Sequence, residues 1–217
     1  MKLFVDTGSI REIEAVAALG IIDVVTTNLS LLAKESGDYR QNLKRICEIV
    51  NGPVSGEVTA TDTAGMLQQG HDIAKIHPHM VVKVPLTKDG IKACKALSGE
   101  GIRVNVTLCF SAAQALLAAK AGATFVSPFV GRLDDVGTNG MELIREIVEI
   151  YDNYQFATEV LVASCRHPIH IVTAARMGAD ICTCPPAVID QLFNHPLTSI
   201  GLEKFLKDWE KSQAVKA

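Results

Sequence analysis

Residues 81–108 read VVKVPLTKDGIKACKALSGEGIRVNVTL, and this stretch decides the fold. It begins with a short run of β-branched residues at 81–85, passes through a helical pattern at 90–97, and ends in a second such run at 103–108. Two strands joined by a helix pair in parallel, because the crossover returns the chain to the same edge of the sheet. The stretch therefore predicts one β-α-β unit of a parallel sheet.

The same alternation continues in both directions along the chain. We expect strands at residues 3–6, 23–27, 54–58, 81–85, 103–108, 124–128, 159–163 and 180–183, and helices at 10–19, 39–50, 63–76, 90–97, 111–121, 141–154, 168–177 and 187–193. Capping boxes at Ser9-x-x-Glu12 and Ser111-x-x-Gln114 mark two helix starts.

About eight such units favour an α/β fold of the closed (β/α)₈ TIM barrel type. An open doubly wound sheet is the alternative. Open doubly wound sheets that bind dinucleotides usually carry the motif Gly-x-Gly-x-x-Gly after the first strand. This chain reads Val5-Asp6-Thr7-Gly8-Ser9 there, which argues against the open sheet.

Length and composition limit the other possibilities. The 217 residues, 48% hydrophobic, predict a single barrel domain over residues 1–217, with an extra C-terminal helix at about 201–211. Lys+Arg 21 against Asp+Glu 24 leaves a net charge of -3, which argues against binding to nucleic acid or to an anionic membrane surface. We find no apolar run of membrane-spanning length and no signal peptide, and we expect a cytoplasmic protein.

The extra C-terminal helix carries an apolar stripe. Its members recur at i, i+3, i+4 and i+7, and they are Leu202, Phe205, Leu206 and Trp209. Such a stripe has to cover something, and the two candidates are the end of this barrel and a neighbouring subunit.

The six cysteines lack the clustered spacing of a disulfide framework, and we expect reduced thiols in or near the core. Cys182 and Cys184 supply only two metal ligands, and no third ligand stands at the spacing of a zinc finger. The sequence therefore predicts no metal.

Lys83 is the most unusual residue of the predicted strands, because valines flank it on both sides. Parallel strands are normally continuous apolar runs, and burying an ionised amine is costly. Burial would favour the neutral amine, which is a nucleophile. A lysine that reaches out to solvent is the alternative, and the flanking valines argue against it.

Other polar residues stand toward the carboxyl ends of the predicted strands. Period-two geometry puts Asn105 and Thr107 on the face opposite Val104, Val106 and Leu108, and therefore inside a barrel. The carboxyl ends of all the strands meet at one mouth, where we expect Asp6, Asn28, Glu57, Lys83, Asn105, Thr107 and Ser127.

Several of these residues also have a purely structural interpretation. Asp6 and Asn28 could cap the helices that follow them, Thr107 could satisfy a backbone group, and Glu57 could pair with a surface lysine. We favour a catalytic mouth because the structural interpretation needs several unrelated coincidences around one lysine.

Two arginines follow the later predicted strands. Arg132 stands in Ser127-Pro-Phe-Val-Gly-Arg132, and Arg166 stands in Ser164-Cys-Arg166-His-Pro. Guanidinium groups with a hydroxyl near a helix start suit a phosphate monoester. The alternative is an ion pair of Arg132 with Asp134 or Asp135.

With these residues assembled, the chain resembles the transaldolase family, and more closely its short bacterial-type members and the related fructose-6-phosphate aldolases. The likeness runs nearly end to end, through ordered motifs on successive predicted strands. These motifs are Asp6-Thr7, Val25-Thr26-Thr27-Asn28, Val82-Lys83-Val84-Pro85, Asn105-Val-Thr107-Leu, Ser127-Pro-Phe129-Val-Gly-Arg132 and Ser164-x-Arg166-His-Pro.

The resemblance implies a cofactor-free enzyme of carbohydrate metabolism, in the pentose phosphate pathway, that acts on phosphorylated ketoses and aldoses. Lys83 would form a Schiff base with the ketose, Asp6 and Glu57 would move protons, and Thr107 would help to hold a catalytic water. The substrate-binding residues would be Thr26, Asn28, Asn105, Ser127 and Phe129, with Arg132, Ser164 and Arg166 on the phosphate. The resemblance also implies homo-oligomeric rings of five or ten subunits.

Two positions separate the branches of this family. Transaldolases carry glutamate and phenylalanine where the aldolases carry glutamine and tyrosine, and this chain has Glu57 and Phe129. Transaldolase activity is therefore favoured over aldol cleavage of fructose 6-phosphate. The chain departs from the family at Leu29, where the family has proline, and a sugar-phosphate-binding protein without catalysis is the third interpretation.

Overall fold

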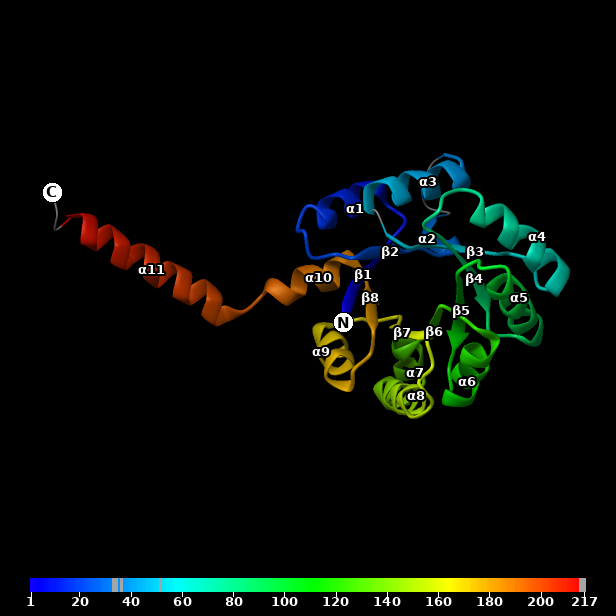
Figure 1. Cartoon of the computed structure of the whole chain (residues 1–217). Helices are drawn as coiled ribbons and strands as arrows, with labels where there is room; N and C mark the ends of the chain where they lie inside the picture. Colours follow the sequence, from blue (N-terminus) through cyan, green and yellow to red (C-terminus); the bar gives the residue numbers. More distant parts are fainter. Residues whose placement is uncertain (33–34, 36, 51, 215–217) are drawn as a thin grey trace.

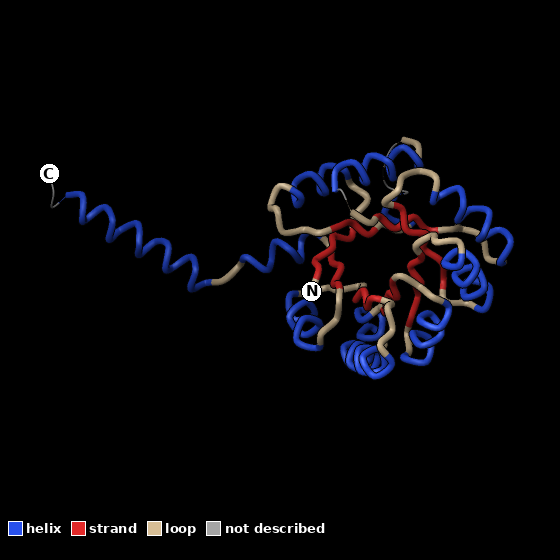
Figure 2. The backbone as a smooth tube through the Cα atoms, viewed as in Figure 1, coloured by secondary structure: helices blue, strands red, loops and turns tan. Residues whose placement is uncertain are grey.

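Eight parallel strands form a closed barrel in the computed structural model, which describes residues 1–217 except 33–34, 36, 51 and 215–217. Each strand pairs with its neighbour in sequence, and β8 closes the ring against β1 (Figures 1 and 2). The strands are β1 (Lys2–Asp6), β2 (Val24–Thr26), β3 (Val54–Glu57), β4 (Met80–Pro85), β5 (Val104–Cys109), β6 (Phe125–Pro128), β7 (Glu159–Val162) and β8 (Ile181–Cys184). The predicted (β/α)₈ barrel is confirmed, and the open sheet is excluded.

Helices surround the barrel, as Figure 2 shows. Those that correspond to predicted helices are α1 (Ile10–Ala17), α3 (Tyr39–Val50), α4 (Thr63–Ala74), α5 (Lys88–Gly99), α6 (Ala112–Ala121), α8 (Gly140–Tyr154), α9 (Pro168–Met177) and α10 (Pro186–Phe193). Two short helices, α2 (Leu29–Leu32) and α7 (Val130–Asp135), were not predicted, because four and six residues are too few to show a helical period.

The two predicted helix starts are confirmed. Ser9 and Ser111 occupy the N-cap positions of α1 and α6, and their hydroxyls accept hydrogen bonds from the amides of Glu12 and Gln114. The Gln114 side chain accepts from the Phe110 amide at 2.8 Å, which ties the end of β5 to the start of α6.

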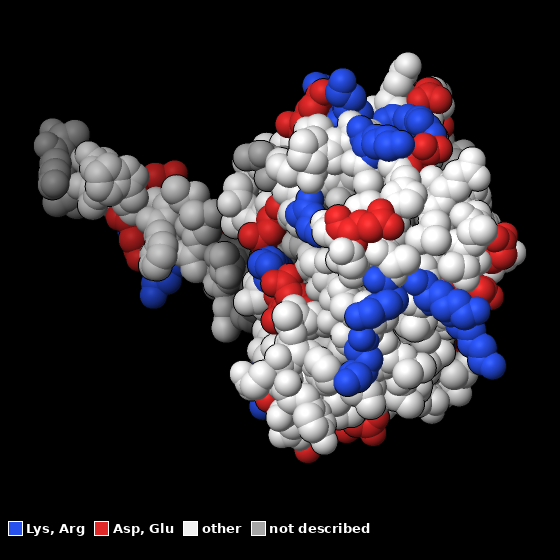
Figure 3. All heavy atoms as spheres, turned by 45° about the vertical axis from the view of Figure 1, so that its right-hand side comes forward, with Lys and Arg blue, Asp and Glu red and all other residues white. Residues whose placement is uncertain are grey.

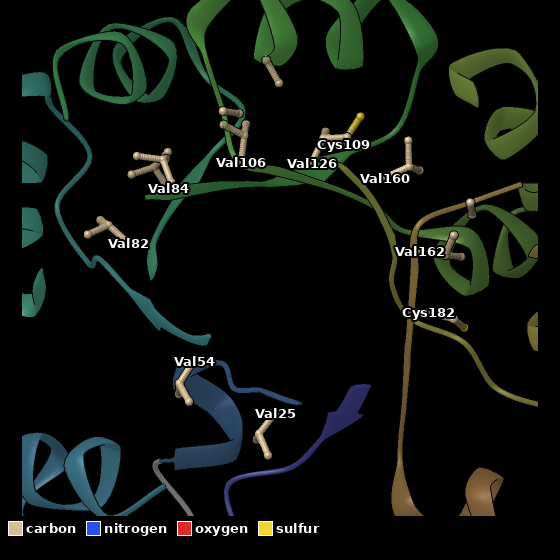
Figure 4. Close-up of a cluster of buried hydrophobic side chains, with 14 of the residues drawn as sticks. Val25, Val54, Val82, Val84, Val106, Cys109, Val126, Val160, Val162 and Cys182 are labelled. Atoms are coloured by element: carbon tan, nitrogen blue, oxygen red, sulfur yellow. The ribbon is translucent and has the colours of Figure 1, made fainter. Parts of the chain in front are cut away.

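Alternate strand residues point into two different layers. Val82, Val84 and Val106 belong to the large core between the barrel and its helices, part of which Figure 4 shows. A smaller buried cluster comprises Phe4, Val24, Val81, Phe125, Leu161, Ala163 and Ile181. Five members of this cluster are each followed, two positions later on the same face of the strand, by a polar residue. These polar residues are Asp6, Thr26, Lys83, Ser127 and Thr183. The barrel interior thus changes from apolar to polar toward the carboxyl ends of its strands.

The prediction was wrong for Leu108. Strict alternation placed it with Val104 and Val106 on the helix-facing side, whereas its side chain is 44% exposed. The pairing of β5 with β6 shifts register between Val106 and Cys109, and Leu108 adopts φ 59°. This irregularity turns the side chain away from the core.

The C-terminal helix α11 (Pro196–Ala214) contains the predicted segment 201–211 and extends beyond it on both sides. Figure 1 shows it projecting away from the barrel, and none of its described residues is buried. Phe205 is 72% exposed and Trp209 is 65% exposed. The apolar stripe therefore does not cover the end of this barrel.

Charges of both signs are interspersed on the face that Figure 3 shows, in agreement with the nearly balanced counts of acidic and basic residues. Within the described ranges, we find no helix that combines the length and the apolar character needed to cross a membrane.

Candidate active site

A cavity of about 160 Å³ opens at the carboxyl ends of the strands. Its lining includes nine of the residues singled out from the sequence, namely Asp6, Thr26, Asn28, Lys83, Asn105, Ser127, Phe129, Arg132 and Ser164. They come from six strands and from the segments that follow them. Of the seven side chains predicted to meet at the mouth, Asp6, Asn28, Lys83, Asn105 and Ser127 line this cavity, whereas Glu57 and Thr107 are not among its lining residues.

A second and larger cleft, of about 270 Å³, lies on the outside of the barrel beside α3 and α4. Glu57 is the single predicted site residue among those that line it. We place the candidate active site in the mouth, because a small-molecule site needs several polar groups that converge on one point.

Lys83 points into the barrel and is 8% exposed. Its register partners are Glu57 on β3 and Asn105 on β5, so three polar side chains stand at one level of the barrel. The Lys83 Nζ lies 3.6 Å from Glu57 Oε2, and it donates a hydrogen bond to the Thr27 carbonyl at 3.3 Å. The neighbouring Val82 and Val84 point the other way, into the helix layer.

Asp6, at the end of β1, shares the cavity with this amine. The Thr26 hydroxyl donates to Asp6 Oδ1 at 3.2 Å, and it lies 2.6 Å from the Thr183 hydroxyl. Burial raises the pKa of Asp6, while the positive charge of Lys83 and the hydrogen bond from Thr26 act in the opposite direction. A carboxyl group in such surroundings is suited to taking up and returning a proton.

Asn105 is held at both ends of its amide. Its Nδ2 donates to the Ser55 hydroxyl at 3.2 Å, and its Oδ1 accepts from the Ser127 hydroxyl at 2.8 Å. The Thr107 hydroxyl differs, since its oxygen is buried and has no hydrogen-bond partner among the described residues. Buried hydroxyls in native proteins nearly always have a hydrogen-bond partner, so this oxygen is available to a bound water or substrate atom.

Asn28 caps a helix, as its structural interpretation predicted, and it also lines the cavity. Its Oδ1 accepts from the Leu31 amide at 2.9 Å, which caps the short helix α2. The backbone of Leu29 begins this helix, where the family pattern has proline.

The two arginines have different surroundings. Arg132, on α7, lines the cavity beside Ser164, which adopts φ 61°. A serine in this left-handed region is under backbone strain, and such residues gather at functional sites. Arg166 is not among the residues that line the cavity, and its guanidinium makes a two-bond ion pair with Asp135. An ion pair with Asp135, the predicted alternative for Arg132, is therefore made by Arg166.

Several parts of the mouth were not identified from the sequence. The lining also includes Leu161, Ala163 and Thr183, and the contact of Lys83 with the Thr27 carbonyl involves only a backbone atom. Thr183 had a detectable signal, because it ends a predicted strand just as Asp6 does.

The cysteine prediction is confirmed. All six cysteines are free and buried. Burial raises the pKa of the Cys47, Cys94 and Cys109 thiols to about 11.

Comparison with known proteins adds independent information. A family model described as "Transaldolase/Fructose-6-phosphate aldolase" matches residues 3–216. A "Probable transaldolase" of Caldicellulosiruptor saccharolyticus is 58% identical over 212 residues, which cover 97% of this chain and 98% of that protein. Proteins with the same name from Chlorobium limicola and Methanococcus maripaludis are 59% and 57% identical, over 96% and 97% of this chain and 97% and 98% of their own.

One solved structure, titled "Structure of a cube-shaped, highly porous protein cage designed by fusing symmetric oligomeric domains", superposes with a TM-score of 0.64. The match covers all of this chain and 80% of that one, at 14% identity. At this identity the likeness concerns the fold alone.

Proposed function

Because the chain belongs to the transaldolase/fructose-6-phosphate aldolase family, we propose that it is a transaldolase that works through a Schiff base on Lys83. It transfers a dihydroxyacetone unit from sedoheptulose 7-phosphate to glyceraldehyde 3-phosphate and yields erythrose 4-phosphate and fructose 6-phosphate, a step of the pentose phosphate pathway. The observation that carries this proposal is the Lys83 amine, buried in the mouth of the barrel 3.6 Å from the Glu57 carboxylate.

The first half-reaction uses Lys83 and Asp6. The Lys83 nitrogen adds to the ketose carbonyl carbon, and loss of water leaves an iminium. Asp6 takes the proton of the hydroxyl on the fourth carbon, the bond between the third and fourth carbons breaks toward the iminium, and the aldose leaves. A three-carbon enamine stays on Lys83.

The second half-reaction reverses these events with another aldehyde. The enamine carbon adds to the acceptor carbonyl, Asp6 returns the proton to the new hydroxyl, and water hydrolyses the iminium to free Lys83. We assign the proton transfers to and from this water to Glu57. The buried Thr107 hydroxyl, which lacks a partner among the described residues, supports a role in holding the water.

The remaining cavity residues bind the substrate in this proposal. Asn28 and Asn105 contact sugar hydroxyls, and Thr26, Ser127 and Phe129 complete the walls. Arg132, Ser164 and Arg166 bind the phosphate, for which the Arg166 guanidinium has to exchange the Asp135 carboxylate for a phosphate oxygen.

Reduction with borohydride tests the covalent step. In the presence of fructose 6-phosphate, we expect a stable adduct on Lys83 in the wild type and none in Lys83→Met. Lys120→Met removes an exposed lysine of α6 and should leave the adduct unchanged. An intact wild type that gives no adduct on Lys83 would rule out the mechanism.

A turnover assay with and without erythrose 4-phosphate separates the candidate functions. We expect turnover of fructose 6-phosphate to depend on the acceptor. Release of free dihydroxyacetone at the same rate without acceptor would identify an aldolase. Binding of fructose 6-phosphate without turnover would identify a non-catalytic sugar-phosphate-binding protein.

We also propose that the protein is a homo-oligomer, a ring of five or ten subunits. An isolated helix is marginally stable in water, and α11 exposes Leu202, Phe205, Leu206 and Trp209. A neighbouring subunit would cover this stripe, and light scattering measures the resulting mass. Six cysteines without the spacing of a disulfide framework fit a cytoplasmic location.

A further inference from the structure

His170, on α9, connects two other segments of the chain through its ring. It is 5% exposed, and its Nε2 lies 2.9 Å from Asp134 Oδ2 on α7. Its Nδ1 accepts a hydrogen bond from the Arg166 amide at 3.2 Å. The ring thus bridges α7 and the segment that follows β7.

These two bonds require one form of the ring. Because Nδ1 accepts, the proton of a neutral ring stands on Nε2, from which it is donated to Asp134. A protonated ring carries a hydrogen on Nδ1 as well, and this hydrogen would face the hydrogen of the Arg166 amide. The bridge is therefore complete only while His170 is neutral.

The bridged segments are the ones that carry the proposed phosphate contacts. Arg132 stands two residues before Asp134 on α7, and Ser164 and Arg166 belong to the segment after β7. The segments also touch directly, because a Cβ at Gly131 would lie 2.3 Å from the Ser164 carbonyl oxygen and 2.7 Å from Arg166 Nε. A small change in their spacing would misplace all three side chains.

We propose that His170 is a positioning residue, which holds the phosphate-binding side chains of Arg132, Ser164 and Arg166 in register and releases them when it is protonated. This inference rests on the proposed function, since it assumes that the site binds a phosphorylated sugar. His170 itself does not line the cavity and acts through Asp134 and the Arg166 amide.

The charged and titratable groups that face the ring are His167, Asp134 and Arg166. Burial lowers the pKa of His170, the nearby His167 and Arg166 lower it further, and Asp134 acts in the opposite direction. The ring is therefore neutral at neutral pH, and the bridge is lost on the acid side.

Two substitutions at His170 test its hydrogen bonds to Asp134 and to the Arg166 amide one at a time. His170→Asn places an amide oxygen near the position of Nδ1, so that it can accept from the Arg166 amide without titrating. His170→Gln places its amide near Nε2, so that it can donate to Asp134 but leaves the Arg166 amide without its acceptor. Each variant keeps only one end of the bridge, so we expect the KM for fructose 6-phosphate to rise about tenfold in both His170→Gln and His170→Asn, with kcat within about twofold of the wild type.

The pH dependence supplies a second readout. The KM of the wild type should rise more steeply below pH 6.5 than that of His170→Asn. The asparagine variant is the reference because the phosphate monoester itself takes up a proton near pH 6, and this affects both proteins equally. His71→Gln is the matched control, because His71 also faces a carboxylate, Glu100, but lies on the outer surface of α4.

Equal KM values in wild type, His170→Asn and His170→Gln would overturn the inference, and so would a fall in kcat with an unchanged KM. If His170→Gln fails to fold, the test rests on the pH dependence of KM in the wild type and in His170→Asn. Parallel KM profiles in these two proteins overturn the inference. A wild type that neither traps nor turns over fructose 6-phosphate refutes the proposed function instead, and calorimetric binding of fructose 6-phosphate by the same variants then tests His170 separately.

Discussion

Gly131 offers a sharp test of the phosphate-binding end of the mouth. Replacing it by alanine would place a methyl group 2.3 Å from the backbone oxygen of Ser164, whereas an ordinary contact between carbon and oxygen is about 3.3 Å. The segment after β7 therefore has to move by about 1 Å, since a backbone atom cannot rotate away. Overpacking of this kind costs about 1–3 kcal/mol of stability.

The effect on activity should exceed the effect on stability. A displacement of about 1 Å in a positioning group can lower a reaction rate about 100-fold, and we expect kcat/KM for fructose 6-phosphate to fall by about this factor in Gly131→Ala. Because the displaced groups are those proposed to bind the phosphate, most of the loss should appear in KM.

A coupled enzyme assay measures both constants, and urea unfolding measures the stability. The matched control is Gly99→Ala at the end of α5, where a new Cβ meets nothing within 4 Å. It should leave both constants unchanged. If Gly131→Ala keeps kcat/KM within about twofold of the wild type while it is folded, the packing of α7 against this segment does not set the site geometry.

Three further predictions concern the rest of the molecule. Asp6→Asn should lose activity yet unfold at a higher urea concentration than the wild type at pH 7. The reason is that the raised pKa of Asp6 means that its ionised form destabilises the fold. This gain in stability should vanish at pH values low enough to protonate Asp6 in both the folded and the unfolded protein. Ile144→Ala, which empties a fully buried position of α8, should cost about 2–5 kcal/mol of unfolding free energy in the same titration, and a loss below about 1 kcal/mol would contradict the assigned packing. The six buried thiols should react with Ellman's reagent far more slowly in the native protein than in guanidinium chloride, and rapid labelling of any native thiol would show that its site is exposed.

The barrel was predictable because its information is local and repeated. Strand and helix periods differ, so the alternation along the chain indicated the fold without any knowledge of contacts. Ser9 and Ser111 marked helix starts for the same reason, since an N-cap bonds to an amide only three residues away. The fold failed to follow the pattern at Leu108, where a register shift between two strands overrides the alternation.

The inner face of the mouth was predictable to a similar degree. Period-two geometry separates Lys83 from Val82 and Val84, and parallel pairing then brings it level with Glu57 and Asn105. Closure of the barrel adds the residues at the ends of the other strands. These placements depend on backbone geometry alone, which a sequence pattern encodes well.

The sequence by itself determined the alternation of strands and helices, the inward position of Lys83 and the gathering of polar strand ends around it. Only the tertiary structure decided that Arg166 pairs with Asp135, that His170 bridges two segments, and that Thr107 keeps a hydroxyl without a partner among the described residues. The physical reason is that each of these depends on how segments without a repeating pattern pack against one another. In such segments the backbone takes single, unrepeated conformations, as Ser164 does at φ 61°, and no periodicity records them.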